Sequence, residues 1–384
     1  MDHSLTVKII RKISEVRRED WDRLVGGGSP FMKWDWLDAL EQTGCAQERT
    51  GWLPHHVIIE KAGELVGACP VYLKLHSQGE FVFDYEWAEV ARELGVTYYP
   101  KLLVGIPFTP VTGLRFLTSD RAARPEVIRA LGQLLVRIAE ENKISSVHVN
   151  FCLEDEAEML EQVGFIRRTG LQFHWQNRGY CSFDDYLNGF RSDRRNKVKR
   201  ERREPLQQGV SIRAMEGEEV TPAHLSTMFQ LYKVHIDKLY YGQQYLTREF
   251  FSEMARRFRP NLCLILAQRE SRIIAGTFNV QDDEAFYGRY WGAFEEQRYL
   301  HFNVCYYAAI EHCIRKGLQR FEAGAGGSFK QLRGLDPRPT ASMHYIVEQR
   351  LKRIIERYLR QETGFVDERR ATLLEKSQLK KADA

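Results

Sequence analysis

The stretch FEAGAGGSFKQLRG, Phe321 to Gly334, gathers residues that could do chemistry near the C-terminal end of the chain. They are one carboxylate, two glycines and two cations: Glu322, Gly324, Gly326, Lys330 and Arg333. No glycine directly precedes the lysine and no Ser or Thr follows it, so the stretch lacks the pattern of a P-loop. The glycines allow a close approach of the backbone to a ligand, and the two cations can hold a carboxylate or a phosphate.

Glu322 is the first candidate for a general base or amine anchor, and His301 is a second candidate acid or base. Glu322 follows Phe321 at the end of a predicted strand, where α/β folds place functional side chains. Structural alternatives remain open for both: Glu322 caps the next helix or pairs with Lys330, and His301 is a cap or packing residue.

Two further blocks contain candidate binding residues. The strand EAFYGRYWGAF alternates aromatic side chains around Arg289, and Tyr290 and Trp291 either line a pocket or face a core. In the first half of the chain, YYPKLLVGIPFTPVTG contains Tyr99, Lys101 and Thr109, which we expect to line a cleft between the halves.

Composition narrows the class of protein. The chain of 384 residues is 43% hydrophobic and 28% charged with a net charge of +4, which is typical of globular proteins and too mild to predict a nucleic-acid binder. Its seven cysteines form no C-x-x-C pair, so we predict neither a zinc site nor a disulfide framework. We also predict no other metal site and no tightly bound cofactor. No apolar run is long enough for a membrane span, and we expect a cytoplasmic protein.

Helix and strand patterns occur twice in the same order, which predicts an internal repeat. VIIEKAGELVGA from Val57 aligns without gaps with ILAQRESRIIAG from Ile265, each a strand, charged turn and strand. GFIRRTGLQFHW from Gly164 aligns with GLDPRPTASMHY from Gly334. Chance likeness of two α/β segments is the alternative. We predict an α/β (α+β) chain with domains at 1–180 and 181–348, followed by a charged helix and tail at 349–384.

A basic segment opens the predicted second domain. RSDRRNKVKRERRE, residues 191–204, should form a helix with cations on most of its circumference, and the candidates for phosphate contact are Arg194, Arg195, Lys197, Lys199 and Arg200. Such a helix can bind RNA phosphates or an anionic membrane surface. The alternative is a solvated helix with Val198 packed inward.

The order of elements resembles the GNAT acyltransferase fold, and six stretches resemble the FemAB-like family described as peptidoglycan biosynthesis/recognition. They are TGWLPHHV, YLKLHSQGEFVFD, YYPKLLVGIPFTPVTG, YGRYWG, LHFNVCYY and FEAGAGGSFKQLRG. This resemblance implies two tandem GNAT-like domains, each a mixed, mostly antiparallel sheet flanked by helices. It also implies a bacterial N-acyltransferase or aminoacyltransferase that acts on an amine acceptor, such as a peptidoglycan precursor.

The chain departs from that family at four positions. Asn303 stands where the family usually has Glu, and Gly326, Ser328 and Phe329 replace Gln, Glu and His. Catalysis is then carried elsewhere, or the substrate differs, or the chain is a recognition protein that binds a cell-wall-type or acyl-carrier ligand without reacting. An RNA-binding module that uses the basic helix is a third reading.

The resemblance leaves three possible donors: acyl-CoA, acyl-carrier protein and aminoacyl-tRNA. The segment after YGRYWGAF has no glycine and two acidic residues, so the usual pyrophosphate loop for coenzyme A is missing from its expected place. The basic helix 191–204 is the expected contact for a tRNA or an acidic carrier protein.

Overall fold

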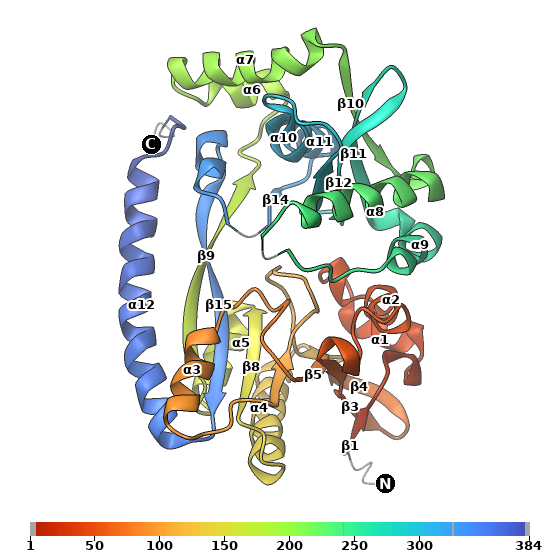
Figure 1. The fold of residues 1–384 in the computed structure, drawn as a ribbon. Coiled ribbons are helices and arrows are strands. Elements are labelled where there is room, and N and C mark those ends of the chain that lie inside the picture. Colours follow the sequence, from red (N-terminus) through yellow and green to blue (C-terminus); the bar gives the residue numbers. More distant parts are fainter. Residues whose placement is uncertain (1–4, 241, 325, 381–384) are drawn as a thin grey trace. The chain divides into compact units, whose positions relative to one another are not determined.

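The computed structural model describes residues 5–240, 242–324 and 326–380. They form two compact units, and neither unit is a continuous piece of chain (Figure 1). Unit 1 comprises Met1–Gly170 and Pro339–Glu368, and unit 2 comprises Leu171–Arg338 and Arg369–Ala384. Each unit combines β-sheet with flanking helices, which confirms the α/β class.

The strands of unit 1 belong to two sheets. The first is antiparallel in the order β1-β3-β4-β7, with β1 (Leu5–Ile10), β3 (His56–Lys61), β4 (Glu64–Cys69) and β7 (Leu117–Thr118). The second has the order β15-β8-β6-β5-β2, with β15 (Asp336–Ile346), β8 (Ser146–Cys152), β6 (Lys101–Val104), β5 (Val71–Lys74) and β2 (Trp52–Pro54). Only β6 and β8 of these neighbours run parallel, as expected for a crossover through a helix.

Helices cover the sheets of unit 1. The crossover helix α4 (Arg124–Glu141) and the short α5 (Glu154–Glu161) bury Leu131, Leu135 and Leu160 against Val147 and Val149 of β8. The remaining helices of the unit are α1 (Arg18–Val25), α2 (Trp34–Gln42), α3 (Tyr85–Glu93) and the first part of α12 (Gln349–Glu375). Trp87 of α3 packs with Leu351 and Ile355 of α12 in a separate small cluster.

Unit 2 has a single sheet in the order β10-β11-β12-β13-β14-β9. Its strands are β10 (Val210–Glu216), β11 (Leu262–Arg269), β12 (Arg272–Gln281), β13 (Ala285–Ala293), β14 (Arg320–Glu322) and the second half of β9 (Ile166–Gln176). Strands β13 and β14 run parallel and pair only from Ala285–Arg320 to Tyr287–Glu322. Beyond Glu322 the pairing stops while β13 continues to Ala293, so the two strands part at this point.

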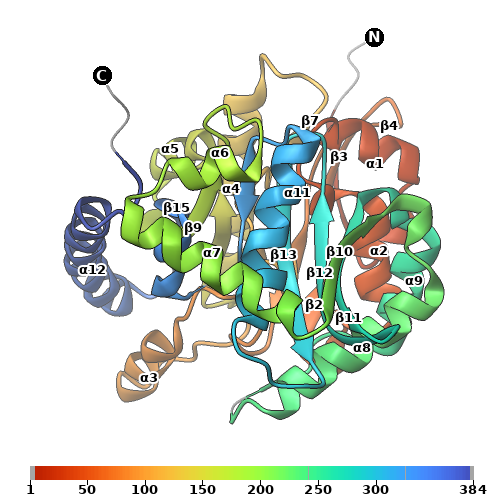
Figure 2. The same ribbon diagram turned by 90° about the horizontal axis from the view of Figure 1, so that it is seen from above.

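Helices lie on both faces of this sheet (Figure 2). One side carries α8 (Pro222–Asp237) and α9 (Arg248–Arg257), where Phe251 packs against Phe278 of β12. The other carries α6 (Phe183–Asn188), α7 (Ser192–Gln207), α10 (Leu300–Phe302) and α11 (Ala308–Lys316). The sequence predicts one continuous helix from His301 to Gly317, but a π-helical turn, Asn303–Tyr307, joins α10 to α11. Such turns insert one extra residue and recur at functional sites.

The hairpins β3–β4 and β11–β12 are formed by the two segments of the first predicted alignment. Each has a register shift at the aligned position, between Ile59 and Glu60 in one and between Ala267 and Gln268 in the other. Both turns place two successive residues at positive φ, Ala62 and Gly63 in one and Glu270 and Ser271 in the other. The two hairpins therefore share a bulge and a turn at aligned positions, which supports the repeat.

The second alignment joins β9 to β15, and these strands are exchanged between the units. By chain order β9 follows β8, yet its second half pairs with β14 in unit 2, where His174 stands opposite Glu322. Strand β15 follows β14 but pairs with β8 in unit 1, where His344 stands opposite His148. The compact units thus differ from the predicted domains 181–348 and 349–384: residues from Pro339 to Glu368 belong to unit 1 because β15 supplies a buried strand there.

Candidate active site

Glu322 lies at the end of β14, at the point where β13 and β14 part. Its side chain is buried, and its Oε1 accepts a hydrogen bond from Arg320 Nε at 2.9 Å. Its Oε2 accepts no hydrogen bond within the described chain and lies 3.8 Å from His174 Nε2. Burial raises the pKa of Glu322 to about 7, against the lowering effect of Arg320. A carboxylate with this pKa and an open oxygen can exchange a proton near neutral pH.

The ion-pair partner of Glu322 tests the alternative that this carboxylate pairs with Lys330. Its ion-pair partner is Arg320 and not Lys330. Arg320 also donates to the Tyr287 hydroxyl at 3.1 Å, and that hydroxyl donates to Asp282 at 3.2 Å. Glu322 is thus held by a chain of charged and polar groups on one edge of β13 and β14.

The loop after β14 brings Lys330 into the interior. Gly324, Gly326 and Gly327 all have positive φ, a conformation that side-chain-bearing residues rarely adopt. The loop turns back so that Lys330 Nζ donates to the Gly324 carbonyl at 2.7 Å. Lys330 is only 3% exposed, and burial lowers its pKa to about 8. The side chain of Ser328 lies outside the described part of the structure.

Arg333, the second predicted cation of this loop, faces the interior of unit 2. Its guanidinium pairs with Glu201 at 3.0 Å and lies 3.4 Å from the centre of the Phe302 ring. It also donates to the Phe329 carbonyl. These contacts engage Arg333 in packing the loop against α7, which is a structural role.

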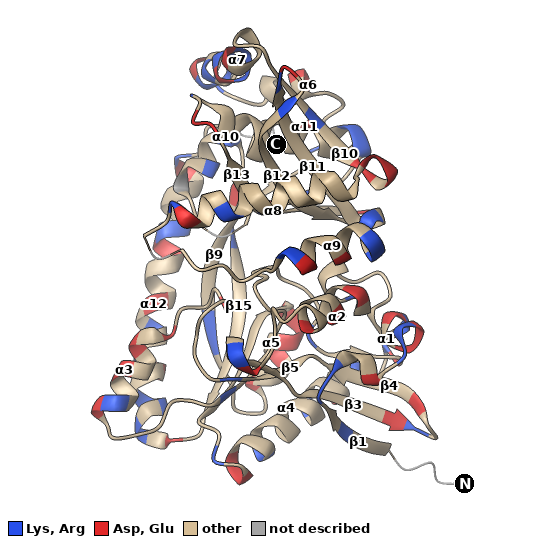
Figure 3. Ribbon diagram, turned by 45° about the vertical axis from the view of Figure 1, so that its right-hand side comes forward, with Lys and Arg blue, Asp and Glu red and all other residues tan. Residues whose placement is uncertain are grey.

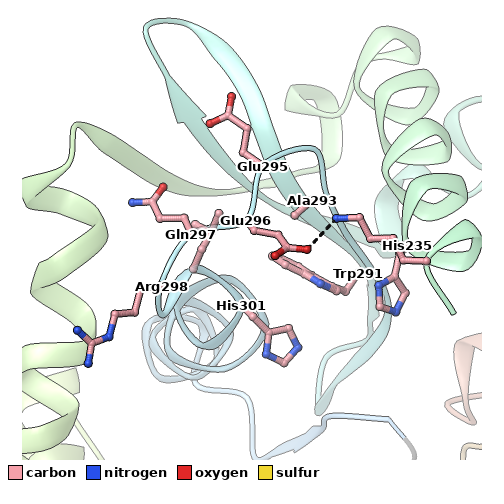
Figure 4. A pocket seen from close by; sticks show the side chains of 10 residues that line it. His235, Trp291, Ala293, Glu295, Glu296, Gln297, Arg298 and His301 are labelled. Carbon is pink, nitrogen blue, oxygen red and sulfur yellow. Dashed lines mark hydrogen bonds and ion pairs between the residues drawn. The ribbon is translucent and has the colours of Figure 1, made fainter.

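His301 and Trp291 meet at a pocket of about 470 Å³ in unit 2 (Figure 4). Their rings are 5.1 Å apart, and His235 of α8 lines the same space. Burial lowers the pKa of His301 to about 4, so this imidazole is neutral at pH 7. His301 does not cap its helix, because the residue at the cap position of α10 is Tyr299. The ring of His301 instead contacts other aromatic rings. Glu296 forms an ion pair with Lys238 at 3.3 Å across the rim.

The neighbouring strand residues divide between pocket and core. Tyr290 packs against Tyr232 of α8, with ring centres 5.1 Å apart, and Arg289 lies 5.4 Å from the Tyr290 ring. Gly292 permits this close packing, since a Cβ there would lie 1.9 Å from the Leu231 carbonyl oxygen. Of the predicted aromatic pair, Trp291 lines the pocket and Tyr290 packs under α8.

Two of the four positions that depart from the family pattern are visible around this pocket. Asn303 is buried in the π-helical turn and donates to the carbonyls of Glu201 and Tyr299. The Phe329 ring lies about 6 Å from the rings of His301 and Tyr306. Both side chains therefore serve local packing in this unit.

The candidates from the first half of the chain lie in unit 1 and are largely enclosed. Lys101 is fully buried and donates to Ser77, Glu80 and Asp84. Tyr99 is half-buried and shares a hydrogen bond with Ser77, while Thr109 is buried and donates to the Pro107 carbonyl. Lys101 is thus neutralised inside its own unit.

The basic helix α7 is rich in Lys and Arg, which Figure 3 draws in blue. Arg194 points inward, donating to the Leu332 carbonyl and lying 3.6 Å from buried Glu201. Arg194, one of the predicted phosphate contacts, therefore faces the interior of unit 2. The cations that remain exposed or half-exposed on α7, with no ion pair among the described residues, are Arg195, Lys197, Lys199, Arg200 and Arg203.

Some functional groups could not be singled out from the sequence. His174 and Arg320 reach Glu322 from the same pair of strands, and the spacing of Arg320 and Glu322 by two residues is the only local signal. His235 comes from α8, far away in the chain. Among the described residues no group of three or more His, Cys, Asp or Glu could hold a metal ion. Nor does any helix in the described chain combine the length and apolarity needed to cross a membrane.

The profile of the FemAB-like family, described as peptidoglycan biosynthesis/recognition, matches residues 12–381. The chain belongs to the FemAB-like family. No curated protein matches the sequence.

Solved structures share the fold of this FemAB-like chain at low identity. FemX has a TM-score of 0.54 and 13% identity over 89% of this chain and 98% of its own. The C-terminal domain of a protein described as a lysylphosphatidylglycerol synthetase, from Agrobacterium fabrum, has a TM-score of 0.52 and 9% identity over 89% and 96%. A tandem GNAT protein of clavulanic acid biosynthesis has a TM-score of 0.47 and 11% identity over 90% and 99%. The shared fold with FemX confirms the fold expected from the FemAB-like resemblance.

Proposed function

We propose that unit 2 transfers an acyl or aminoacyl group from a carrier-bound donor to an amine acceptor. The observation that carries this proposal is the buried Glu322 carboxylate, which has one oxygen without a hydrogen bond where β13 and β14 part. Membership of the FemAB-like family supports a transferase.

In the proposed reaction the acceptor nitrogen attacks the carbonyl carbon of the donor ester or thioester. Glu322 accepts the proton that the nitrogen loses, and it returns this proton to the leaving oxygen or sulfur as the C–O or C–S bond to the carrier breaks. The Lys330 ammonium supplies positive charge near the developing oxyanion. Its pKa of about 8 leaves most of it protonated at pH 7.

Two features favour aminoacyl-tRNA or an acyl-carrier protein over coenzyme A as the donor. The segment after β13 contains Glu295 and Glu296, which pair with Arg269 and Lys238, and such acids disfavour a pyrophosphate. The outer cations of α7 supply a surface for phosphates or an acidic carrier. We further propose a peptidoglycan-precursor amine as the acceptor and a cytoplasmic location. All seven cysteines are free, which fits a reducing compartment.

The Glu322→Gln variant tests the assignment of the base. We expect turnover with the best of a panel of labelled acyl-CoA, acyl-carrier and aminoacyl-tRNA donors to fall about 100-fold or more, with KM little changed. Glu270→Gln, which removes an exposed carboxylate from the β11–β12 turn, is the matched control. The kcat/KM of the unmodified protein should decline as the pH drops below about 7, because Glu322 then becomes protonated. Unchanged turnover in Glu322→Gln would exclude Glu322 as the base.

A second reading is supported by Lys330 and Phe329. Lys330 Nζ already donates to its own loop, and Phe329 packs against the His301 ring at the position where the family usually has His. A protein that binds the ligand without reacting fits these contacts. Tight binding of an acceptor or carrier by calorimetry, with no turnover of any donor in the panel, would favour recognition over transfer.

Charge reversal on α7 tests the carrier surface. Replacing Lys199, Arg200 and Arg203 by Glu should raise KM for a tRNA or acidic-carrier donor, and the effect should weaken at high salt. KM for a small uncharged donor should not change, and this serves as the control. Equal KM values before and after the replacement would remove α7 from donor binding.

A further inference from the structure

Unit 1 contains a cavity of about 270 Å³ between the C-terminal half of α4 and the strands β1, β3, β5 and β6. Its floor is aliphatic, with buried Val57, Val71, Leu102 and Leu135, and half-buried Ile138 forms one wall. The volume is at the small end of the range of about 300–1,000 Å³ for ligand pockets, so only a slim ligand fits. The cavity lies outside the Glu322 site, in the other unit.

A single charged group borders this aliphatic space. Arg11 lines the cavity, and its guanidinium donates to Nε2 of His55. His55 Nδ1 lies 3.1 Å from the Leu53 carbonyl, which fixes the tautomer: Nδ1 carries the proton and Nε2 is free to accept from Arg11. Burial, with a smaller contribution from Arg11, lowers the pKa of His55, which keeps the imidazole neutral.

No carboxylate within the described residues comes within ion-pair distance of the Arg11 guanidinium. Glu15 accepts only from the Arg11 main-chain nitrogen. Asp38 and Glu41 border a separate hollow on the other side of Arg11, and Glu41 is already bound to His56. Arg11 therefore brings an uncompensated positive charge, aimed by His55, to the mouth of an aliphatic cavity.

We propose that this cavity binds a straight-chain aliphatic carboxylic acid, with its chain among the α4 and strand side chains and its carboxylate on Arg11. One cation matches the single charge of a carboxylate better than the charge of about −1.5 to −2 on a phosphate ester. Apart from His55 and Asn142, whose amide donates to the Ile138 carbonyl, the lining beside Arg11 is aliphatic and offers no hydrogen bonds to a polar tail. This binding function is independent of acyl transfer at Glu322.

A chain-length series on the unmodified full-length protein is the first test. In calorimetry, each pair of methylenes from butanoate to decanoate should tighten binding roughly tenfold until the cavity is filled. The heat-capacity change should become more negative with each step. The alcohols of the same lengths should bind about tenfold or more weakly than the acids. A flat series, alcohols that match the acids, or alkyl phosphates that bind more tightly than the acids would each overturn the proposal.

Two variants locate the binding. Arg11→Met keeps the apolar stem and should weaken octanoate binding about tenfold or more while octanol binding stays the same. Arg17→Met, which changes another exposed arginine, is the control. Ile138→Trp should fill the cavity and abolish binding of both ligands, whereas Ile354→Trp on exposed α12 should not. Thermal unfolding checks that each variant is folded, and full binding by folded Ile138→Trp would contradict the assigned cavity.

Discussion

Lys101 in unit 1 and Lys330 in unit 2 are both buried, and their electrostatic surroundings are opposite. Lys101 in unit 1 donates to Glu80 and Asp84, and although burial lowers its pKa, these carboxylates raise it to about 12. Lys330 in unit 2 donates to a main-chain carbonyl, and burial lowers its pKa to about 8. A buried lysine is thus a permanent charge when carboxylates enclose it, and an amine that titrates near neutral pH when a carbonyl receives it.

The same contrast applies to the carboxylates. Asp84 has its pKa lowered because the effects of Lys101 and neighbouring donors together outweigh its burial. Glu322 has its pKa raised, because burial outweighs the nearby Arg320. Unit 1 therefore has a sealed charge cluster, whereas Glu322 and Lys330 in unit 2 have pKa values near neutral pH. The first supports the fold and the second can support chemistry.

Removing the cation from the sealed cluster should have the largest effect. Lys101→Met leaves buried Asp84 without its cation and leaves Glu80 paired with Lys74, whose Nζ lies 3.9 Å away. We expect a loss of about 3–5 kcal/mol in the free energy of unfolding. Urea unfolding followed by circular dichroism measures it. Lys197→Met, at an exposed position on α7, is the control. If Lys101→Met loses less than about 1 kcal/mol, the carboxylates of unit 1 do not depend on Lys101. Adding Glu80→Gln to Lys101→Met should recover part of the loss.

Acid should weaken unit 1 through its paired histidines. His148 and His344 share a hydrogen bond between their Nδ1 atoms at 2.7 Å, and burial lowers both pKa values, that of His148 to about 3. The other charged groups near the pair are Lys101, Asp84 and Arg168. Since the unfolded histidine binds a proton below about pH 6.5 and the folded one does not, stability falls as pH drops. His148 alone should account for about 2 kcal/mol between pH 7 and pH 5.

Comparison of His148→Gln with the unmodified protein checks this effect. The variant should lose less stability than the unmodified protein between pH 7 and pH 5, because it has one fewer group to protonate on unfolding. An identical pH dependence in the two proteins would mean that His148 is not kept neutral by the fold.

Base should strengthen unit 2 through Lys330. The unfolded lysine stays protonated up to about pH 10.5, while the folded amine loses its proton above about pH 8. The unfolded state therefore binds more protons, and stability gains about 1 kcal/mol between pH 7 and pH 9. Lys330→Met should lack this gain in urea titrations at the two pH values. Lys101 contributes no change in this window, because its folded pKa is raised, and its stabilisation is lost only above about pH 10.5.

The smallest expected effect compares the two hairpin turns. Gly63 and Ser271 occupy the same aligned position at positive φ, and a serine there is strained. Ser271→Gly should stabilise the protein and Gly63→Ser should destabilise it, each by roughly 0.5–1 kcal/mol in the free energy of unfolding. The melting temperature should rise in the first variant and fall in the second. Nothing lies within 4 Å of a Cβ placed on Gly63, so crowding does not enter. Effects of the same sign in both variants would show that the two turns are not equivalent.

Local patterns explain why much of the fold could be predicted. Alternating apolar residues around charged turns marked both hairpins. Pro125 lies in the first turn of α4, where proline is favoured. Glu322 could be identified because it ends a short apolar strand. These features depend on residues close together in the chain.

The features that escaped prediction depend on distant contacts. Glu80 and Asp84 lie outside any strand or helix and reach Lys101 only through the tertiary fold. Glu201 turns Arg194 and Arg333 inward from positions that look like solvated cations. The π-helical turn at Asn303 has no simple residue signature. The hydrogen bond from the Asn303 side-chain amide to the Glu201 carbonyl of α7 forms only in the folded chain.

The exchange of β9 and β15 has a consequence for how this protein is made. One side of β8 pairs with β6, but the other side has no partner strand until Pro339–Ile346 has been synthesised. The ribosome must therefore make almost the whole chain before that sheet is complete. Translation therefore leaves one side of β8 open while Leu171–Arg338 of unit 2 is being built. During this time the nascent chain has an uncovered strand edge, which is prone to aggregation and is a target for holding chaperones.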